Sequence, residues 1–125
     1  MALHPIAHAA SRPDHPAVIM TGSGQKMTYG EMDAASNRFA HLLRSRGLGP
    51  NAGGGDAFGV LLENRLEYFV LNWGSQRAGT MLVPVSTRLT GPEIAYILKD
   101  CEARLLVTSI RYAEVLETVR AELPD

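Results

Sequence analysis

The fold is decided by two stretches, Gly55-Asp56-Ala57-Phe58-Gly59-Val60-Leu61-Leu62 and Gln76-Arg77-Ala78-Gly79-Thr80-Met81-Leu82-Val83-Pro84. The apolar run 57–62 has the length and flanks of a strand that is buried on both faces. Asn64, with Glu67 three residues later, predicts the start of a helix that ends near Ala78-Gly79. Residues 81–83 then predict a short strand broken by Pro84, so the stretch as a whole indicates a strand–helix–strand unit.

The same alternation continues toward both ends of the chain. Thr90-Gly91-Pro92-Glu93 and Thr28-Tyr29-Gly30-Glu31 have the spacing of capping boxes, and each predicts the start of an amphipathic helix. The later helix leads to a third buried strand over 104–107 and a last helix over 112–123, and the earlier one ends before Gly47. A short helix over 5–10 and two short strands over 17–20 and 26–28 precede them, the strands joined by a hairpin-type loop.

Apolar strands that alternate with helices predict an α/β fold with a largely parallel sheet and helices packed on it. The short N-terminal β-hairpin either joins this sheet as a mixed edge or forms a small separate ribbon. The length of 125 residues suits one domain, so we expect residues 1–125 to fold as a single unit.

Composition excludes several classes of protein. Apolar residues make up 46% and charged residues 20%, which is typical of a globular protein, and the net charge of −1 weighs against a nucleic-acid partner. Cys101 is the only cysteine, so an intramolecular disulfide framework is excluded. No apolar run reaches the roughly 18–20 residues of a membrane span. The start of the chain lacks the pattern of a secretory signal, and we therefore expect a cytoplasmic protein without a transmembrane segment.

Several possible sites have a simpler structural interpretation. Gly22-Ser23-Gly24-Gln25-Lys26 leads into a strand and not into a helix N-terminus, so we interpret it as a turn and not as a phosphate loop. His4 and His8 share a short helix without a third ligand, so no metal site is predicted. Cys101 is interpreted as a structural thiol. Phe69 and Trp73 are expected in the core, and Tyr29 and Tyr96 are expected to pack with one polar end in water.

Arg88 is the one candidate binding residue. It lies in Val83-Pro84-Val85-Ser86-Thr87-Arg88-Leu89, which leaves the carboxyl end of a predicted strand and enters a helix cap. Ligands of open α/β sheets bind outside those strand ends, and a guanidinium there is suited to a phosphate. A solvated loop arginine is the alternative.

Several segments together resemble a known family. Met27-Thr28-Tyr29-Gly30-Glu31-Met32 resembles the first core motif of adenylate-forming (AMP-binding) enzymes, and the run from Gln76 to Val85 resembles the second. The continuation Ser86-Thr87-Arg88-Leu89-Thr90 is similar to acyl-CoA synthetases of the fatty-acid–CoA ligase type in particular. The resemblance covers nearly the whole chain in the same order. It implies the N-terminal subdomain of the adenylate-forming ligase fold.

The resemblance also implies a chemistry for the intact enzyme. A carboxylate attacks the α-phosphate of ATP to give an acyl-adenylate and pyrophosphate, and the thiol of coenzyme A then displaces AMP, with Mg²⁺ assisting. Arg88 matches an arginine that contacts the nucleotide part of coenzyme A in some relatives. No catalytic residue and no metal ligand is carried over to this chain.

The residues that perform this chemistry lie downstream of the matched region in the family. The only two lysines, Lys26 and Lys99, do not follow a proline, and neither sits in a phosphate-loop or adenylation-lysine motif. We therefore expect the chain alone to bind none of ATP, Mg²⁺ and coenzyme A, to be inactive, and to need the remaining part of the ligase as its partner. The family runs directly from its Gly-Leu turn into Gly-Asp, so residues 51–54 (Asn-Ala-Gly-Gly) are an insertion of low cost to stability.

Two other hypotheses belong to different classes. The chain could be a free-standing assembly module that kept the fold, lost catalysis and associates with itself through an uncovered sheet edge and apolar face. It could also be a flavodoxin-like nucleotide binder, for which Leu62-Glu63-Asn64-Arg65 is a poor match because an acidic residue stands where a phosphate would approach.

Overall fold

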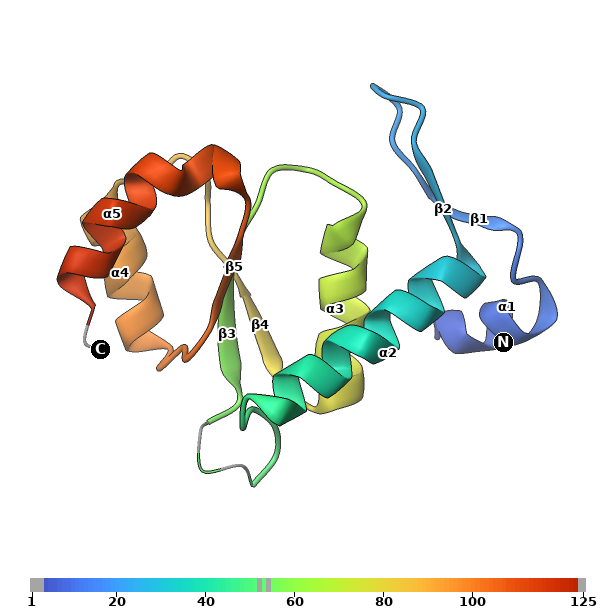
Figure 1. Cartoon of the computed structure of the whole chain (residues 1–125), viewed down its shortest axis with the longest axis horizontal. Helices are drawn as coiled ribbons and strands as arrows, with labels where there is room; N and C mark the ends of the chain where they lie inside the picture. The colour runs from blue at the N-terminus through green and yellow to red at the C-terminus, as the bar shows by residue number, and fades with distance from the viewer. Residues whose placement is uncertain (1–3, 52, 54, 124–125) are drawn as a thin grey trace.

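The computed structural model describes residues 4–51, 53 and 55–123 of the 125-residue chain. In this part of the chain helices and strands alternate in the predicted order (Figure 1). The elements are α1 (Pro5–Ser11), β1 (Pro16–Ile19), β2 (Lys26–Thr28), α2 (Tyr29–Ser45), β3 (Ala57–Leu61), α3 (Glu67–Ala78), β4 (Met81–Pro84), α4 (Gly91–Asp100), β5 (Leu106–Thr108), the 3₁₀ turn η1 (Ile110–Tyr112) and α5 (Ala113–Glu122).

The three parallel strands stand in the order β4-β3-β5, and helices cover both faces of this sheet. Figure 1 shows α2 and α3 on one side of the sheet and α4 and α5 on the other. Strands β1 and β2 pair with each other in antiparallel fashion and form a separate two-stranded ribbon beside α1 and the start of α2. The α/β class is thus confirmed, and of the two alternatives for the hairpin the separate ribbon is the correct one.

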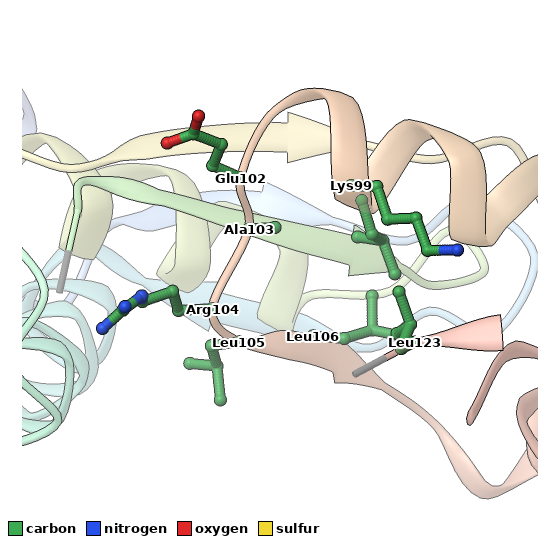
Figure 2. A pocket seen from close by; sticks show the side chains of 8 residues that line it. Lys99, Glu102, Ala103, Arg104, Leu105, Leu106 and Leu123 are labelled. Carbon is green, nitrogen blue, oxygen red and sulfur yellow. The ribbon is translucent and has the colours of Figure 1, made fainter. Parts of the chain in front are cut away.

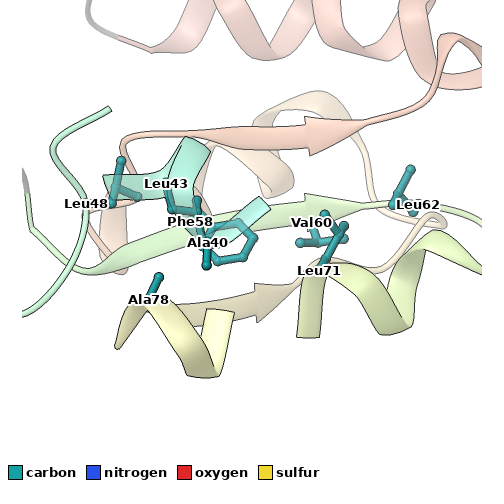
Figure 3. Packing of buried hydrophobic residues seen from close by; sticks show 8 residues of the cluster. All are labelled: Ala40, Leu43, Leu48, Phe58, Val60, Leu62, Leu71 and Ala78. Carbon is teal, nitrogen blue, oxygen red and sulfur yellow. The ribbon is translucent and has the colours of Figure 1, made fainter. Parts of the chain in front are cut away.

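Strand β3 is the centre of the core because all five of its residues are buried. Phe58 and Val60 point toward α2 and α3, where they pack with Leu43 and Leu71 (Figure 3). Leu61 alternates to the other face, where it joins a second cluster built with α4 and α5. Because successive side chains of a strand point to opposite faces, this one apolar run contributes residues to an apolar core on each face of the sheet.

Helices α2 and α3 approach closely at a glycine. A Cβ on Gly74 would lie 2.7 Å from Cδ1 of Phe39 and 3.0 Å from the carbonyl oxygen of Ser36. Nearby, the largely buried Arg77 of α3 forms an ion pair with Asp33 and donates a hydrogen bond of 2.7 Å to Oδ1 of Asn37, both on α2. The second family-like motif thus contributes the residues that attach α3 to α2.

The predicted start of α3 is wrong. The helix begins at Glu67, and its N-cap, Leu66, makes no side-chain capping hydrogen bond. The Glu67 carboxylate is instead held by Arg65, whose Nε and Nη2 donate at 2.8 and 2.9 Å. Because the Glu67 carboxylate is held by Arg65, it does not cap the Asn64 amide. The spacing of Asn64 and Glu67 matches a capping box, but no capping box forms here.

The outer strands also differ from expectation. Strand β5 runs over Leu106–Thr108, two residues later at its start than predicted, and its side chains are half-buried. Strand β4 is exposed at both ends and includes Pro84. Both strands lie at edges of the sheet, so one of their sides has no neighbouring strand among the described residues. Three consecutive apolar residues in the sequence do not distinguish such an edge strand from a central strand.

Two aromatic side chains are more exposed than expected. Phe69 is 44% exposed and Tyr96 is 68% exposed, so the first does not lie in the core and the second packs little of its ring. Trp73 is half-buried, with the His4 ring edge-on at 4.9 Å. Tyr29 is half-buried between His8 and His15 and under the guanidinium of Arg12, as a packing role predicts.

Candidate functional site

The carboxyl ends of the three parallel strands lie at one edge of the sheet, where open α/β folds bind ligands. The segments that leave these ends are residues 62–66 after β3, residues 85–90 after β4 and Ser109 after β5. The polar and charged groups that they place at this edge include Glu63, Ser109 and Arg88. We refer to these three segments as the carboxyl edge.

Glu63 joins the ends of β3 and β5. Its Oε2 accepts a hydrogen bond of 2.8 Å from the Ser109 hydroxyl, and its Oε1 lies 3.5 Å from Nη1 of Arg65. Its own backbone amide and the Ser109 hydroxyl lower the pKa of the Glu63 carboxyl, with the charges of Arg65 and Arg111 acting in the same direction. The carboxylate is therefore ionised at neutral pH and repels a phosphate from this end of the edge.

Arg88 lies on the connection from β4 to α4. Its backbone amide donates to Oγ of Ser86 at 3.3 Å, which shapes the turn. The next helix begins at the Thr90–Glu93 capping box, in which the Thr90 amide donates to Oε2 of Glu93 at 2.8 Å. These Thr90 hydrogen bonds lower the pKa of the Glu93 carboxyl.

The Arg88 side chain is exposed and, among the described residues, its guanidinium has neither an ion pair nor a hydrogen-bond partner. It is thus available to an anion from solvent. The structure brings Glu63, Arg65 and Ser109 together but records no side-chain contact between them and Arg88. Arg88 as a binding residue stays a prediction, and sequence reasoning missed the Glu63–Ser109 pair. The signal was the position of both residues near the ends of predicted strands, which a parallel sheet brings to one edge.

The other candidates keep their structural interpretation. The loop from Gly22 to Lys26 is the turn of the β1–β2 hairpin, closed by a hydrogen bond of 2.8 Å from the Met20 amide to the Gln25 carbonyl. His4 caps α1 by accepting from the Ile6 amide at 3.2 Å. No group of three potential metal ligands occurs within the described part of the chain. Of the insertion 51–54, residues 52 and 54 lie outside the described residues.

The surface also has two grooves that Arg88 does not line. One, of about 730 Å³, lies beside the start of β5 and is called the β5 groove (Figure 2). Its lining is Leu98, Lys99, Glu102, Ala103, Arg104, Leu105, Leu106 and Leu123. The other, of about 360 Å³, lies between the β1–β2 ribbon and the start of α3 and is called the hairpin groove. Its lining is Val18, Ile19, Met20, Thr21, Asn64, Arg65, Tyr68 and Phe69.

In the described residues, no helix is long and apolar enough to cross a membrane.

A parallel sheet covered on both faces, with helices following the carboxyl ends of its strands, is the frame of many nucleotide-handling enzymes. Comparison with known proteins identifies the family of this chain. The sequence pattern of the AMP-binding enzyme family matches residues 6–125, so the chain belongs to this family.

Individual relatives and a solved structure agree with this assignment. The chain is 37% identical over 118 residues to a fatty acid–[acyl-carrier-protein] ligase, ScoC, of Streptomyces coeruleorubidus. It is 31% identical over 114 residues to the long-chain-fatty-acid–CoA ligase FadD13 of Mycobacterium tuberculosis. These alignments cover 94% and 91% of the chain and 22% of each relative, so the chain spans about a fifth of their length. The crystal structure of the N-terminal domain of FACL13 from Mycobacterium tuberculosis superposes with a TM-score of 0.83 at 30% identity, covering 97% of this chain and 29% of that domain.

Proposed function

We propose that this chain is the N-terminal part of an ATP-dependent acyl-CoA synthetase, one domain that supplies part of the scaffold of the ligase. The intact enzyme converts a carboxylate, ATP and coenzyme A into acyl-CoA, AMP and pyrophosphate through an acyl-adenylate. The observation that carries the proposal is the collinear match of residues 6–125 to the AMP-binding family, with fatty-acid ligases among the relatives.

We propose that this chain needs other residues to bind ATP, because the described residues offer no phosphate loop. A phosphate loop needs a strand before it and a helix N-terminus after it, but the glycine-rich loop before Lys26 is a hairpin turn that leads into strand β2. The turn after β3 presents Glu63, which is ionised and unfavourable to a phosphate. We therefore expect adenylation to depend on residues outside this chain.

The residues of this chain fit one contact with coenzyme A, between the Arg88 guanidinium and a phosphate. Arg88 offers an exposed guanidinium at the carboxyl edge, and guanidinium groups bind phosphate in bidentate fashion. Its proposed role is to hold a phosphate of the nucleotide part of coenzyme A in the intact enzyme. An acyl-carrier protein presents its thiol on a protein instead, and the experiment below separates these two acceptors.

A graft tests both proposals. Residues 6–125 replace the matching segment of the Mycobacterium tuberculosis long-chain ligase, and acyl-CoA formation is measured. We expect the grafted enzyme to keep activity, because the two segments share their fold. In this graft Arg88→Ala is expected to raise the KM for coenzyme A by about tenfold, the effect of losing one charge-assisted contact, and to leave the KM for ATP unchanged.

The matched control is Arg38→Ala, which removes an exposed arginine from α2, far along the chain from the carboxyl edge. A folded graft without activity contradicts the proposed scaffold role. Equal kinetics of the Arg88→Ala and Arg38→Ala grafts contradict the proposed contact with coenzyme A. A graft that transfers acyl groups to an acyl-carrier protein but not to coenzyme A assigns the acceptor to the protein thiol.

A further inference from the structure

Helix α1 contacts the rest of the chain through the rings of two histidines. The His4 ring lies edge-on to Trp73 of α3 with the ring centroids 4.9 Å apart, and the His8 ring lies against Tyr29 of α2 at 5.0 Å. Pro5 is the one buried residue of α1, and the two apolar clusters of the described core include no residue of this helix. Because a helix of seven residues is not stable alone, these ring contacts are important for holding α1 in place.

Each of the two histidines accepts a hydrogen bond at Nδ1. The Ile6 amide donates to Nδ1 of His4 at 3.2 Å and so caps α1, and Nη2 of Arg12 donates to Nδ1 of His8 at 3.2 Å. An amide N–H and a guanidinium only donate, so both Nδ1 atoms are without a proton in this structure. A protonated imidazole carries hydrogen on both ring nitrogens. Protonation of either histidine therefore removes its hydrogen bond.

The surroundings of the two rings are unfavourable to further positive charge. The Arg12 guanidinium beside His8 also lies over the Tyr29 ring, 5.5 Å from its centroid, and the His15 ring approaches the same tyrosine at 6.3 Å. Tyr29 is the first residue of α2, and His4 is the N-cap of α1, so both histidines lie near a helix N-terminus with its partial positive charge. The last turn of α1 favours a cation at His8, but Arg12 is in direct contact with this ring.

Acidic side chains of the neighbouring segments do not offset this charge. Glu31 on α2 is held in its capping box, Asp33 on α2 pairs with Arg77, and Glu67 on α3 pairs with an arginine of the preceding loop. Asp14, in the connection from α1 to β1, is exposed. Throughout the part of the chain that the structure describes, no carboxylate forms an ion pair with a histidine. An added proton on either ring thus meets cations and not a carboxylate.

We propose that the docking of α1 is a pH-sensitive switch, in which α1 lies on α2 and α3 while His4 and His8 are neutral and is released when they gain protons. Histidine is the side chain whose charge ordinarily changes between pH 5 and 8. Protonation removes two hydrogen bonds and adds two cations next to Arg12 and the helix N-termini, so it favours the released state. Release uncovers the rings of Trp73 and Tyr29.

The exposure of Trp73, the one tryptophan of the chain, measures release. In the 125-residue protein, quenching of its fluorescence by acrylamide is expected to be stronger at about pH 5.5 than at about pH 8. The ratio of released to docked α1 is expected to rise about tenfold for each histidine, the effect of one lost hydrogen bond with its added repulsion. Nuclear Overhauser contacts between the His8 and Tyr29 rings are expected at the higher pH and are lost at the lower one.

A double variant keeps the hydrogen bonds and removes the titration. Asparagine caps a helix N-terminus, and the glutamine amide oxygen accepts from a guanidinium. His4→Asn combined with His8→Gln is therefore expected to keep α1 docked and to make the quenching independent of pH. The matched control is His41→Gln, which removes an exposed imidazole toward the other end of α2 and is expected to keep the full pH dependence. Circular dichroism checks that each variant is folded.

The readout is conformation and not activity, so its failure is distinct from a failure of the proposed ligase role. Equal quenching and unchanged ring contacts at the two pH values overturn the proposal. A pH dependence that persists in the double variant overturns it as well, because another group then causes the change. Loss of the pH dependence in His41→Gln assigns the effect to α2 and contradicts a switch at α1.

Discussion

At the scale of single residues, Gly74 permits the close approach of α2 and α3. A side chain there would meet the Phe39 ring at 2.7 Å and the Ser36 carbonyl at 3.0 Å, and a backbone carbonyl inside a helix does not move easily. Gly74→Ala is expected to lower the free energy of unfolding by about 1–2 kcal/mol, the cost of overpacking less the gain in helix propensity. Urea unfolding followed by circular dichroism measures it.

Gly22→Ala is the matched control for this prediction. Nothing lies within 4 Å of a Cβ at Gly22, so the change in stability is expected to stay within about 0.5 kcal/mol. A Gly74→Ala variant as stable as Gly22→Ala would show that the two helices separate at no cost, contrary to the packing described above.

Glu63 gives stability a dependence on pH. Its pKa is lowered from 4.5 in the folded chain, mainly by its own backbone amide and then by the Ser109 hydroxyl. A lowered carboxyl pKa contributes stability that is present above 4.5 and is lost as the pH falls through the folded value. Glu63→Gln is therefore expected to destabilise the chain more at neutral pH than in acid well below 4.5.

Urea unfolding of the unaltered chain and of Glu63→Gln, each at neutral pH and in acid, checks this expectation. Gln25→Ala, which changes an exposed and uncharged side chain in the hairpin loop, is the control and is expected to give a difference that does not depend on pH. The same loss for Glu63→Gln at both pH values would contradict the role of the ionised carboxylate.

At this scale the sequence predicted residues whose role follows from local position. Arg88 was found because it follows a strand and precedes a helix cap. Glu63 and Ser109 are 46 residues apart, and only the register of β3 with β5 brings them within 2.8 Å. The sequence therefore offered only the position of both residues near the ends of predicted strands, while the hydrogen bond itself depends on the tertiary register.

At the scale of elements, the Thr28–Glu31 capping box fixes the start of α2. The Glu31 amide donates to Oγ1 of Thr28 at 3.2 Å, and the Thr28 amide donates to Oε2 of Glu31 at 2.8 Å. Thr28→Ala is expected to cost about 1 kcal/mol of stability, because one helix-end amide loses its acceptor. Thr21→Ala in the exposed hairpin turn is the control, and equal stability of the two variants would contradict a capping role.

The helices and strands were predicted well where one local sequence signal defines their bounds. They were predicted less well where contacts with neighbouring residues or strands set the bounds. Both capping boxes and the buried strand β3 were correct, because hydroxyl and carboxylate spacing or a long apolar run defines them. The start of α3 was wrong because Arg65 binds Glu67, and the start of β5 was wrong because an edge strand pairs on one side only. These outcomes depend on contacts between groups and not on a periodicity.

At the scale of the whole molecule, the chain is a sheet with helices on both faces and a carboxyl edge with one available arginine, Arg88. Family membership explains the collinear motifs. Nothing in the local patterns of the sequence predicted that Pro84, which has no N–H, belongs to a strand at an edge of the sheet. That follows from the register, in which Pro84 lies opposite Val60.

We propose that this chain is a scaffold part whose nucleotide chemistry is supplied by residues outside it. Isotope exchange between pyrophosphate and ATP, measured on the purified 125-residue chain with fatty acids of several lengths, tests this proposal. We expect no exchange above the rate without protein, since no phosphate-binding loop precedes a helix in the described residues. Acid-dependent exchange that is proportional to the concentration of the chain would contradict it.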